Sequence, residues 1–211
     1  MKALVLWSSR TGNTKAVGEA IYEALPCEKE IFESGRQPKD LSGYDLIYVG
    51  FWGYRQGADM PSRNVLSSLH GKKVAIYGTA GTYPDSPAAM SYLKSSSELL
   101  AKDNIFLGGF MSQGRVHSFH IGKRNEHAEK VHPMTPERLA RLQEAEKHPN
   151  ETDFKNAAAW ALKMLEKSKP VKSVKPGNLF QTGIYVFILI SCFSFFYNEI
   201  ISYIFTMSSI P

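Results

Sequence analysis

A run of hydroxyl and amide side chains directly follows the first apolar segment of the chain, residues 3–7. A helix that begins after such a run offers unpaired N–H groups and the positive end of its dipole, which together attract an anion. Hydroxyl groups can donate to phosphate oxygens, and a glycine lets the backbone turn closely around the anion. We therefore predict a phosphate-binding loop, formed by Ser8, Ser9, Arg10, Thr11, Gly12, Asn13 and Thr14.

Two better-known phosphate loops do not fit this run. No Gly-Lys-Ser/Thr ends it, which excludes a Walker loop, and its single glycine excludes the dinucleotide-binding pattern. Each Ser, Thr or Asn taken alone is also consistent with an ordinary helix N-cap. The whole run, placed directly after a buried strand, favours phosphate binding.

Apolar runs and helical periodicities alternate over residues 3–111, which predicts an α/β fold with a parallel sheet. Strands are expected at 3–7, 28–33, 46–50, 73–78 and 105–111, with 28–33 near a sheet edge. Helices are expected at 14–25, 62–69, 87–101, 135–147 and 152–166. The polar loops 8–13, 50–61 and 78–86 each follow a strand. Ligands of open parallel sheets bind at such strand ends, so we expect these loops to form one site.

The sequence Ser9-Arg10-Thr11-Gly12-Asn13-Thr14 resembles the phosphate-binding motif of the flavodoxin family, Ser/Thr-x-Thr-Gly-x-Thr. The resemblance covers residues 1–166. It implies a doubly wound, five-stranded parallel sheet of order 2-1-3-4-5, with FMN bound between the first and third strands. Arg10 is a basic departure from the small residue found in some relatives, and either pairs with the phosphate or points to solvent. This sequence also lacks the strongly acidic composition of many flavodoxins.

The second loop opens with Phe51, Trp52 and Gly53. A flavin ring is flat and largely apolar, so an aromatic side chain just beyond a strand end suits it. The family resemblance implies that Gly53 belongs to a peptide that rotates as the flavin is reduced, a motion that glycine permits at low cost. The alternative role for Trp52 is packing in a core or an interface.

The third loop combines small residues with an aromatic ring. Its small residues would let backbone N–H groups approach the polar edge of the flavin, and Tyr83 would stack as a second ring. Tyr83 could equally be a loop tyrosine packed on protein. After the following strand, Gln113 and Gly114 also border the expected site. The third-loop residues expected to contact FMN are Thr79, Ala80, Gly81, Thr82 and Tyr83.

Composition excludes several other functions. The net charge is +5, but residues 1–166 hold 21 basic and 19 acidic side chains and no basic stripe with aromatics, so nucleic acid is not an expected partner. Two cysteines, Cys27 and Cys192, cannot build a disulfide framework or a zinc site and indicate a reduced, intracellular protein. Of His117, His120, His127, His132 and His148, only His117 and His120 have a spacing that suits a pair of ligands on one helix, and no cysteine or carboxylate cluster completes a metal site, so a metal is not expected. No catalytic acid, base or nucleophile stands out.

Residues 111–114, 132–138 and 147–150 are similar to a narrower group, the BilS-type flavodoxin-like proteins that accompany bilirubin reductase in gut anaerobes. This resemblance implies an FMN-binding electron carrier that serves a partner reductase acting on a tetrapyrrole. The alternative is an NAD(P)H-dependent FMN or quinone oxidoreductase on the same fold, with residues 54–61 and 112–132 supplying the nicotinamide site.

The last part of the chain differs from the rest. Residues 167–177 form a basic, proline-containing linker, and residues 178–211 form a hydrophobic tail. Eighteen residues, 180–197, would extend about 27 Å as a helix, close to the thickness of a bilayer core. The lysines before this segment predict that the domain lies on the cytoplasmic face. The tail is either a membrane anchor or an extension without selected function.

Overall fold

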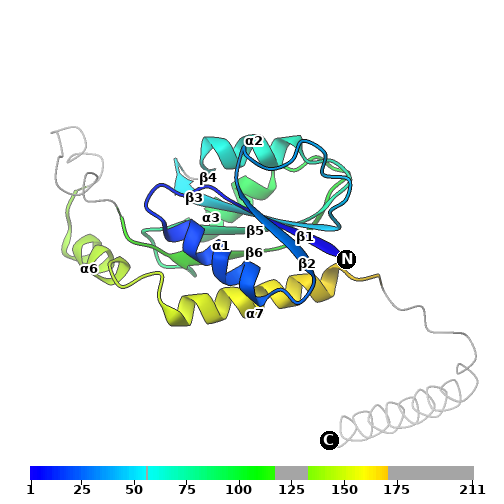
Figure 1. Ribbon diagram of the computed structural model, residues 1–211. Coiled ribbons are helices and arrows are strands. Elements are labelled where there is room, and N and C mark those ends of the chain that lie inside the picture. The colour runs from blue at the N-terminus through cyan, green and yellow to red at the C-terminus, as the bar shows by residue number, and fades with distance from the viewer. Residues whose placement is uncertain (56, 117–132, 171–211) are drawn as a thin grey trace, which may run out of the picture. The chain divides into compact units, whose positions relative to one another are not determined.

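The computed structural model describes residues 1–55, 57–116 and 133–170, and residues 1–169 form one compact unit (Figure 1). Strands and helices alternate over much of the chain, as expected from the sequence, but β2, β3 and β4 follow one another with no helix between them in the described residues. The strands are β1 (Lys2–Trp7), β2 (Glu28–Glu33), β3 (Leu46–Tyr54), β4 (Gly57–Ala58), β5 (Lys73–Ala80) and β6 (Ile105–Gln113). The helices are α1 (Asn13–Ala24), α2 (Met60–Ser68), α3 (Pro87–Ser97), α6 (Pro136–Ala145) and α7 (Glu151–Ser168).

The sheet has the strand order β2-β1-β3-β5-β6, and all neighbours on this path are parallel. The short strand β4 pairs with the end of β3 in the antiparallel sense. The predicted flavodoxin-like order is therefore confirmed, and β2 lies at an edge as expected. The order reverses between β1 and β3, and this switch point is where an open parallel sheet binds its ligand.

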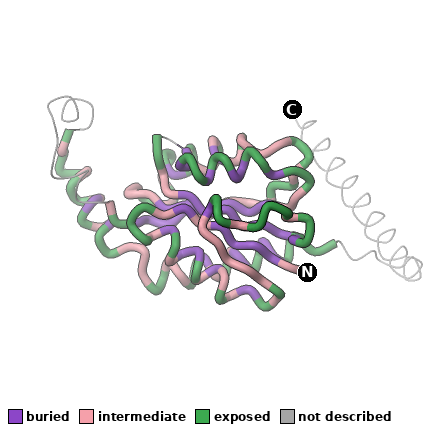
Figure 2. The backbone as a smooth tube through the Cα atoms, turned by 45° about the horizontal axis from the view of Figure 1, so that its top comes forward, coloured by how far each residue is buried: buried purple, intermediate pink, exposed green. Residues whose placement is uncertain are grey.

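Helices cover both faces of the sheet, with α1 and α7 on one side and α2 and α3 on the other (Figure 1). Successive side chains of β1 alternate between the two faces: Leu4 and Leu6 pack with α2 and α3, whereas Ala3 and Val5 pack with α1 and α7. Figure 2 shows the buried central strands between these layers. Burial on both faces explains why these strands are continuous apolar runs.

The strands run further than the sequence predicted. Trp52 pairs in register with Thr79, and Ala80 pairs with Gln113, so residues assigned to loops lie on strands. The expected loop 50–61 is instead the end of β3 followed by β4. Pairing continues here because the three strand ends satisfy each other's backbone groups, which no local pattern in the sequence reports. Helix α3 ends earlier than expected, at Ser97.

The helix starts predicted near residues 87 and 135 are confirmed, and each is capped by a hydroxyl side chain. The Ser86 side chain accepts from the Ala89 N–H, and the Thr135 side chain accepts from the Arg138 N–H. Among residues 1–55, 57–116 and 133–170, no helix combines the length and the hydropathy that a membrane span requires. The expected anchor at 180–197 lies outside the described residues.

Candidate functional site

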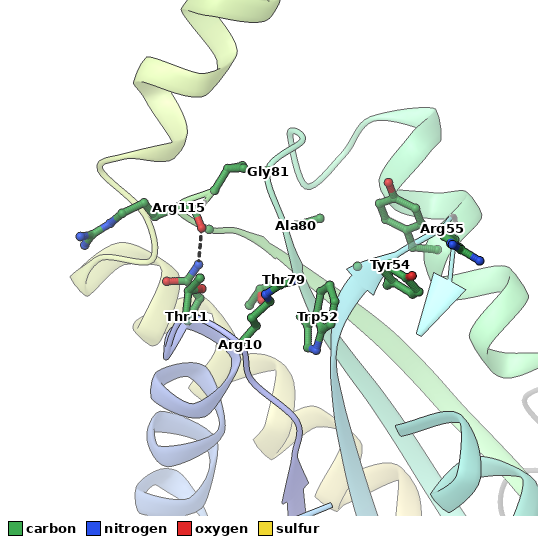
Figure 3. A pocket seen from close by; sticks show the side chains of 14 residues that line it. Arg10, Thr11, Trp52, Tyr54, Arg55, Thr79, Ala80, Gly81 and Arg115 are labelled. Atoms are coloured by element: carbon green, nitrogen blue, oxygen red, sulfur yellow. Dashed lines mark hydrogen bonds between the residues drawn. The ribbon is translucent and has the colours of Figure 1, made fainter. Parts of the chain in front are cut away.

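A cavity of about 580 Å³ lies at the carboxyl ends of the central strands, where the loops after β1, β5 and β6 meet the end of β3 (Figure 3). Its volume is in the range of small-molecule and cofactor sites. Among the described residues, it is lined by Arg10, Thr11, Asn13, Trp52, Gly53, Tyr54, Arg55, Thr79, Ala80, Gly81, Tyr92, Gly114, Arg115 and Val116.

The loop between β1 and α1 has the features of an anion site. Gly12 is the N-cap of α1 and has a left-handed φ of 89°, and no side chain caps the helix. The first turn of α1 contains no acidic residue, and its N–H groups have no partner within the helix. The Ser9 hydroxyl oxygen is buried without a hydrogen-bond partner among the described residues. Buried hydroxyls are normally paired, so this one is available to a ligand oxygen.

Two side chains expected to contact the phosphate are bonded to the protein itself. Thr14 is fully buried, and its hydroxyl lies 2.8 Å from the hydroxyl of Thr79. The side-chain amide of Asn13 donates to the Arg115 carbonyl oxygen at 2.9 Å (Figure 3). These two bonds join the first loop to the ends of β5 and β6. Their side chains therefore fix the shape of the cavity, while the backbone of the loop stays available for the anion.

Trp52 forms an aromatic wall of the cavity. The guanidinium carbon of Arg10 lies 5.7 Å from the centroid of the Trp52 ring, within the range of a cation–π contact. The Tyr54 ring lies 5.2 Å from the Trp52 ring and tilts by 56°. Gly53, between these two aromatic residues, is closely approached: a Cβ there would lie 3.1 Å from the Ala80 Cβ and 3.2 Å from the Tyr92 ring.

The buried carboxylate of Asp59 accepts a hydrogen bond from the backbone of Trp52. Its carboxylate is 1% exposed and accepts from the Trp52 N–H at 3.1 Å, from the Ser62 N–H at 3.3 Å and from the Ser62 hydroxyl at 3.0 Å. The same carboxylate caps α2. A buried carboxylate with three donors fixes both groups it joins, so Asp59 positions the aromatic wall relative to α2.

The structure brings most of the predicted contacts together. Of the residues predicted from the sequence, those that line the cavity are Arg10, Thr11, Asn13, Trp52, Gly53, Thr79, Ala80, Gly81 and Gly114. Those that do not line it are Ser9, Gly12, Thr14, Phe51, Thr82, Tyr83 and Gln113. Ser9, Gly12 and Thr14 still shape the anion loop.

The residues outside the lining have other surroundings. Phe51 is fully buried against Gly78 on the sheet face opposite α1, and Tyr83 is 43% exposed. The Gln113 side chain turns to α6 and donates to the Arg141 carbonyl oxygen at 3.3 Å. Tyr54, Arg55, Arg115 and Val116 also line the cavity, although the sequence placed them only in the ranges considered for a nicotinamide site. Tyr92 also lines it and was not indicated by the sequence at all. Tyr92, from α3, therefore contributes an aromatic ring to the lining, whereas Tyr83 does not.

His148 joins the site to the helices α6 and α7. Its Nδ1 lies 2.5 Å from an Asp153 carboxylate oxygen and its Nε2 lies 3.4 Å from a Glu144 carboxylate oxygen. Its carbonyl oxygen accepts from the Arg115 N–H at 3.1 Å. The residues described by the structure contain no cluster of His, Cys, Asp and Glu that could hold a metal ion. The other histidines considered for a metal site, 117, 120, 127 and 132, lie outside them.

The environment of His148 predicts a pH-dependent stability. Burial lowers the pKa of His148, but the hydrogen bonds and charges of Asp153 and Glu144 outweigh burial and raise this pKa above its ordinary value. The charged form therefore stabilises the fold below the unfolded-state pKa, about 6.5, and this contribution is lost as the pH rises through the folded-state pKa.

The expected result is that the free energy of unfolding, measured by urea denaturation, falls as the pH rises from the unfolded-state pKa, about 6.5, through the raised folded-state pKa of His148. In His148→Gln, which keeps a polar side chain but cannot titrate, the fall should be smaller. Parallel pH profiles of the two proteins would show that His148 does not make this contribution.

Most of the chain is similar to flavodoxin-type proteins. Residues 4–161 match the family model described as "Flavodoxin domain". A flavodoxin-like domain-containing protein BilS from Clostridioides difficile is 30% identical over 183 residues, which cover 81% of this chain and 100% of the relative. A protein of the same name from Clostridium symbiosum is 26% identical over 134 residues, 55% of this chain and 70% of the relative.

Solved structures share the fold at low sequence identity. A flavodoxin from the domain Archaea has a TM-score of 0.51 at 16% identity, with 81% of this chain and 100% of that chain covered. A flavodoxin of Streptococcus pneumoniae TIGR4 has a TM-score of 0.51 at 13% identity, with 79% and 99% covered. At these identities, the structures bear on the fold alone.

Proposed function

The chain belongs to the flavodoxin domain family and its cofactor is FMN; we propose that it carries electrons to a partner reductase. One observation carries the proposal: the cavity joins an anion-binding loop to an aromatic wall, yet no carboxylate, histidine, lysine or cysteine lines it among the described residues. An enzyme that uses a side chain as general acid or base needs a group of one of these kinds or a tyrosine, and Tyr54 and Tyr92 are the lining tyrosines among the described residues. An electron carrier needs no such group, because FMN when bound supplies the one- and two-electron chemistry.

The residues present fit the cofactor. The backbone of Gly12 and the first turn of α1 would hold the phosphate, together with the free hydroxyl of Ser9. Trp52 would lie against the flavin ring, and the close approach of Ala80 and Tyr92 to Gly53 would exclude water from one side. Asp59 and the Thr14–Thr79 pair would keep these groups in place.

For the acceptor, we propose a reductase that acts on bilirubin. Two relatives carry the name BilS, and the sequence stretches 132–138 and 147–150 resemble that group. A direct test is to supply the reduced, FMN-loaded protein to a bilirubin reductase. The proposal requires bilirubin to be consumed only when both proteins are present.

We also propose that residues 180–197 attach the domain to the cytoplasmic face of a membrane. The support is the length and hydropathy of this segment and the lysines that precede it. The full chain, but not a chain ended at residue 169, should then remain in the membrane fraction after an alkaline carbonate wash. Release of the full chain by that wash would count against an anchor.

The central experiment is an absorbance spectrum of the purified protein followed by mixing with NADPH. We expect a yellow protein with one FMN per chain that can be reduced photochemically and that NADPH alone does not bleach. A protein that cannot take up FMN would contradict the cofactor assignment. Rapid bleaching by NADPH without a partner would favour the NAD(P)H-dependent oxidoreductase instead.

A further inference from the structure

The rim of the cavity is positively charged. Three arginines and no carboxylate are among the described residues that line it. Arg115 is paired with Glu146, with 3.5 Å between Nε and the carboxylate, and Figure 3 shows its side chain pointing away from Trp52. Arg10 and Arg55 are exposed and form no ion pair with a described residue. Two guanidinium charges at the mouth therefore lack an anionic partner in this part of the chain.

These two charged groups lie at the ends of one row of contacting side chains. Arg10 lies over the Trp52 ring, the Trp52 ring contacts Tyr54, and the Arg55 guanidinium carbon lies 5.2 Å from the Tyr54 centroid. We call these four residues the arginine–aromatic rim. Figure 3 shows Arg10 beside Trp52, and Tyr54 with Arg55 further along the end of β3. A cation–π contact with a ring restrains each guanidinium group while its N–H groups can still donate.

Arg55 also has a strained backbone conformation. Its φ of 44° is left-handed and is the only such value at a non-glycine residue in the part of the chain that the structure describes. A side chain there costs about 1–2 kcal/mol relative to glycine. Strain of this kind concentrates at functional positions. Tyr54, directly before it, is 42% exposed although it is a large aromatic residue.

Nearby carboxylates do not cancel the charge of the rim at its surface. Asp59 lies behind Trp52, is 1% exposed and is fully engaged with three donors. Asp85, in the segment between β5 and α3, is exposed, and it is a single carboxylate against two unpaired guanidinium groups.

We propose that the arginine–aromatic rim is the docking surface for an electron-transfer partner whose own docking surface is rich in carboxylates. This inference rests on the proposed function, because it names the chemistry of the partner that meets the flavin. Arginine and tyrosine are the residue types that carry most energy at protein interfaces. Arginines in a fixed fork pair with carboxylates, and a field of opposite sign accelerates encounter at low salt. The charges at this interface would thus be the opposite of those of an acidic carrier: this carrier would present the positive surface and its partner the negative one.

The test uses the FMN-loaded full chain, labelled with ¹⁵N, and two haem proteins as probes: cytochrome b5, which is acidic, and cytochrome c, which is basic. Titration followed by amide chemical shifts gives both the affinity and the site. We expect cytochrome b5 to shift the amide signals of Arg10 and residues 52–55, and the affinity to fall about tenfold between about 20 mM and about 500 mM NaCl. Cytochrome c should bind more weakly than cytochrome b5 at low salt.

Two charge-removing variants localise the effect. Arg55→Gln, which removes the charge but keeps a polar side chain, should weaken binding of cytochrome b5 about threefold at low salt. The matched control is Lys163→Gln, an exposed cation on α7 away from the cavity lining, which should leave the affinity unchanged. The visible spectrum of each variant is recorded first, and affinities are compared only between proteins that hold one FMN per chain.

Several results would overturn the docking proposal without touching the cofactor. These are stronger binding of cytochrome c, shifts confined to a different face, equal effects of the two variants, or no binding of cytochrome b5 at low salt by a yellow, FMN-loaded protein. A colourless protein that cannot take up FMN would overturn the proposed function itself. The two failures are therefore separated by the visible spectrum before any titration begins.

Discussion

Replacing Gly12 by valine is expected to weaken FMN binding about 100-fold, equivalent to about 2.8 kcal/mol. Gly12 is the N-cap of α1 with φ of 89°, a conformation that β-branched residues adopt only under strain. A valine relieves that strain by rotating the peptide, which turns the N–H groups of the loop away from the phosphate. Titration of FMN, followed by quenching of its fluorescence, measures the change in dissociation constant.

Gly35 offers a matched control because its φ is almost the same. It has φ of 94°, and a Cβ at either glycine meets nothing within 4 Å. Gly35→Val and Gly12→Val should therefore lose similar stability, about 1–2 kcal/mol. Gly35 follows β2 and does not line the cavity, so Gly35→Val should bind FMN normally. Equal losses of affinity in both variants would show that the Gly12 effect is general destabilisation and would contradict the anion loop.

The sequence was sufficient for the positions of the central strands because burial on both faces makes each a continuous apolar run. It was not sufficient for the ends of those strands. β3 continues to Tyr54 because Trp52 pairs with Thr79 and because β4 folds back on Gly53 and Tyr54. Both pairings join residues through backbone groups, which carry no side-chain signal.

Within the site, too, the features that depend on neighbouring residues could be predicted, and those that depend on long-range pairing could not. The first loop was readable because its hydroxyls, amide and glycine are adjacent in the chain. Asp59 before Met60 and Pro61 is a recognisable helix start, yet its bond to the Trp52 N–H depends on the return of the chain through β4. Tyr92 had no local signal at all. Its place beside Gly53 follows from the packing of α3 against β4.

A second large effect is expected in the core beneath the site. Gly50→Ala should lower the free energy of unfolding by about 3 kcal/mol, the upper part of the range for overpacking. A Cβ at Gly50 would lie 2.2 Å from Tyr77 Cζ and 2.4 Å from its hydroxyl oxygen. Tyr77 is fully buried, and its hydroxyl donates to the Leu6 carbonyl oxygen at 2.9 Å. The ring has no exposed side toward which it can yield.

Urea denaturation of three further proteins tests this mechanism. Gly43→Ala is the control, because a Cβ there meets nothing within 4 Å and its φ is not left-handed; its stability should be unchanged. Tyr77→Leu alone should be destabilised by the lost ring and by the lost hydrogen bond from its hydroxyl to the Leu6 carbonyl oxygen. The double variant Gly50→Ala/Tyr77→Leu should be more stable than the sum of its parts by at least about 1 kcal/mol.

This coupling separates a steric cause from a backbone cause. If Gly50 were needed only for its own conformation, removing the Tyr77 ring would rescue nothing and the two effects would add. Additivity is the outcome that contradicts the packing described here. Gly50 also accepts hydrogen bonds at its carbonyl oxygen from the Ser8 N–H and the Ser62 hydroxyl. A methyl group that displaces β3 would therefore disturb both the start of the anion loop and the helix that Asp59 caps.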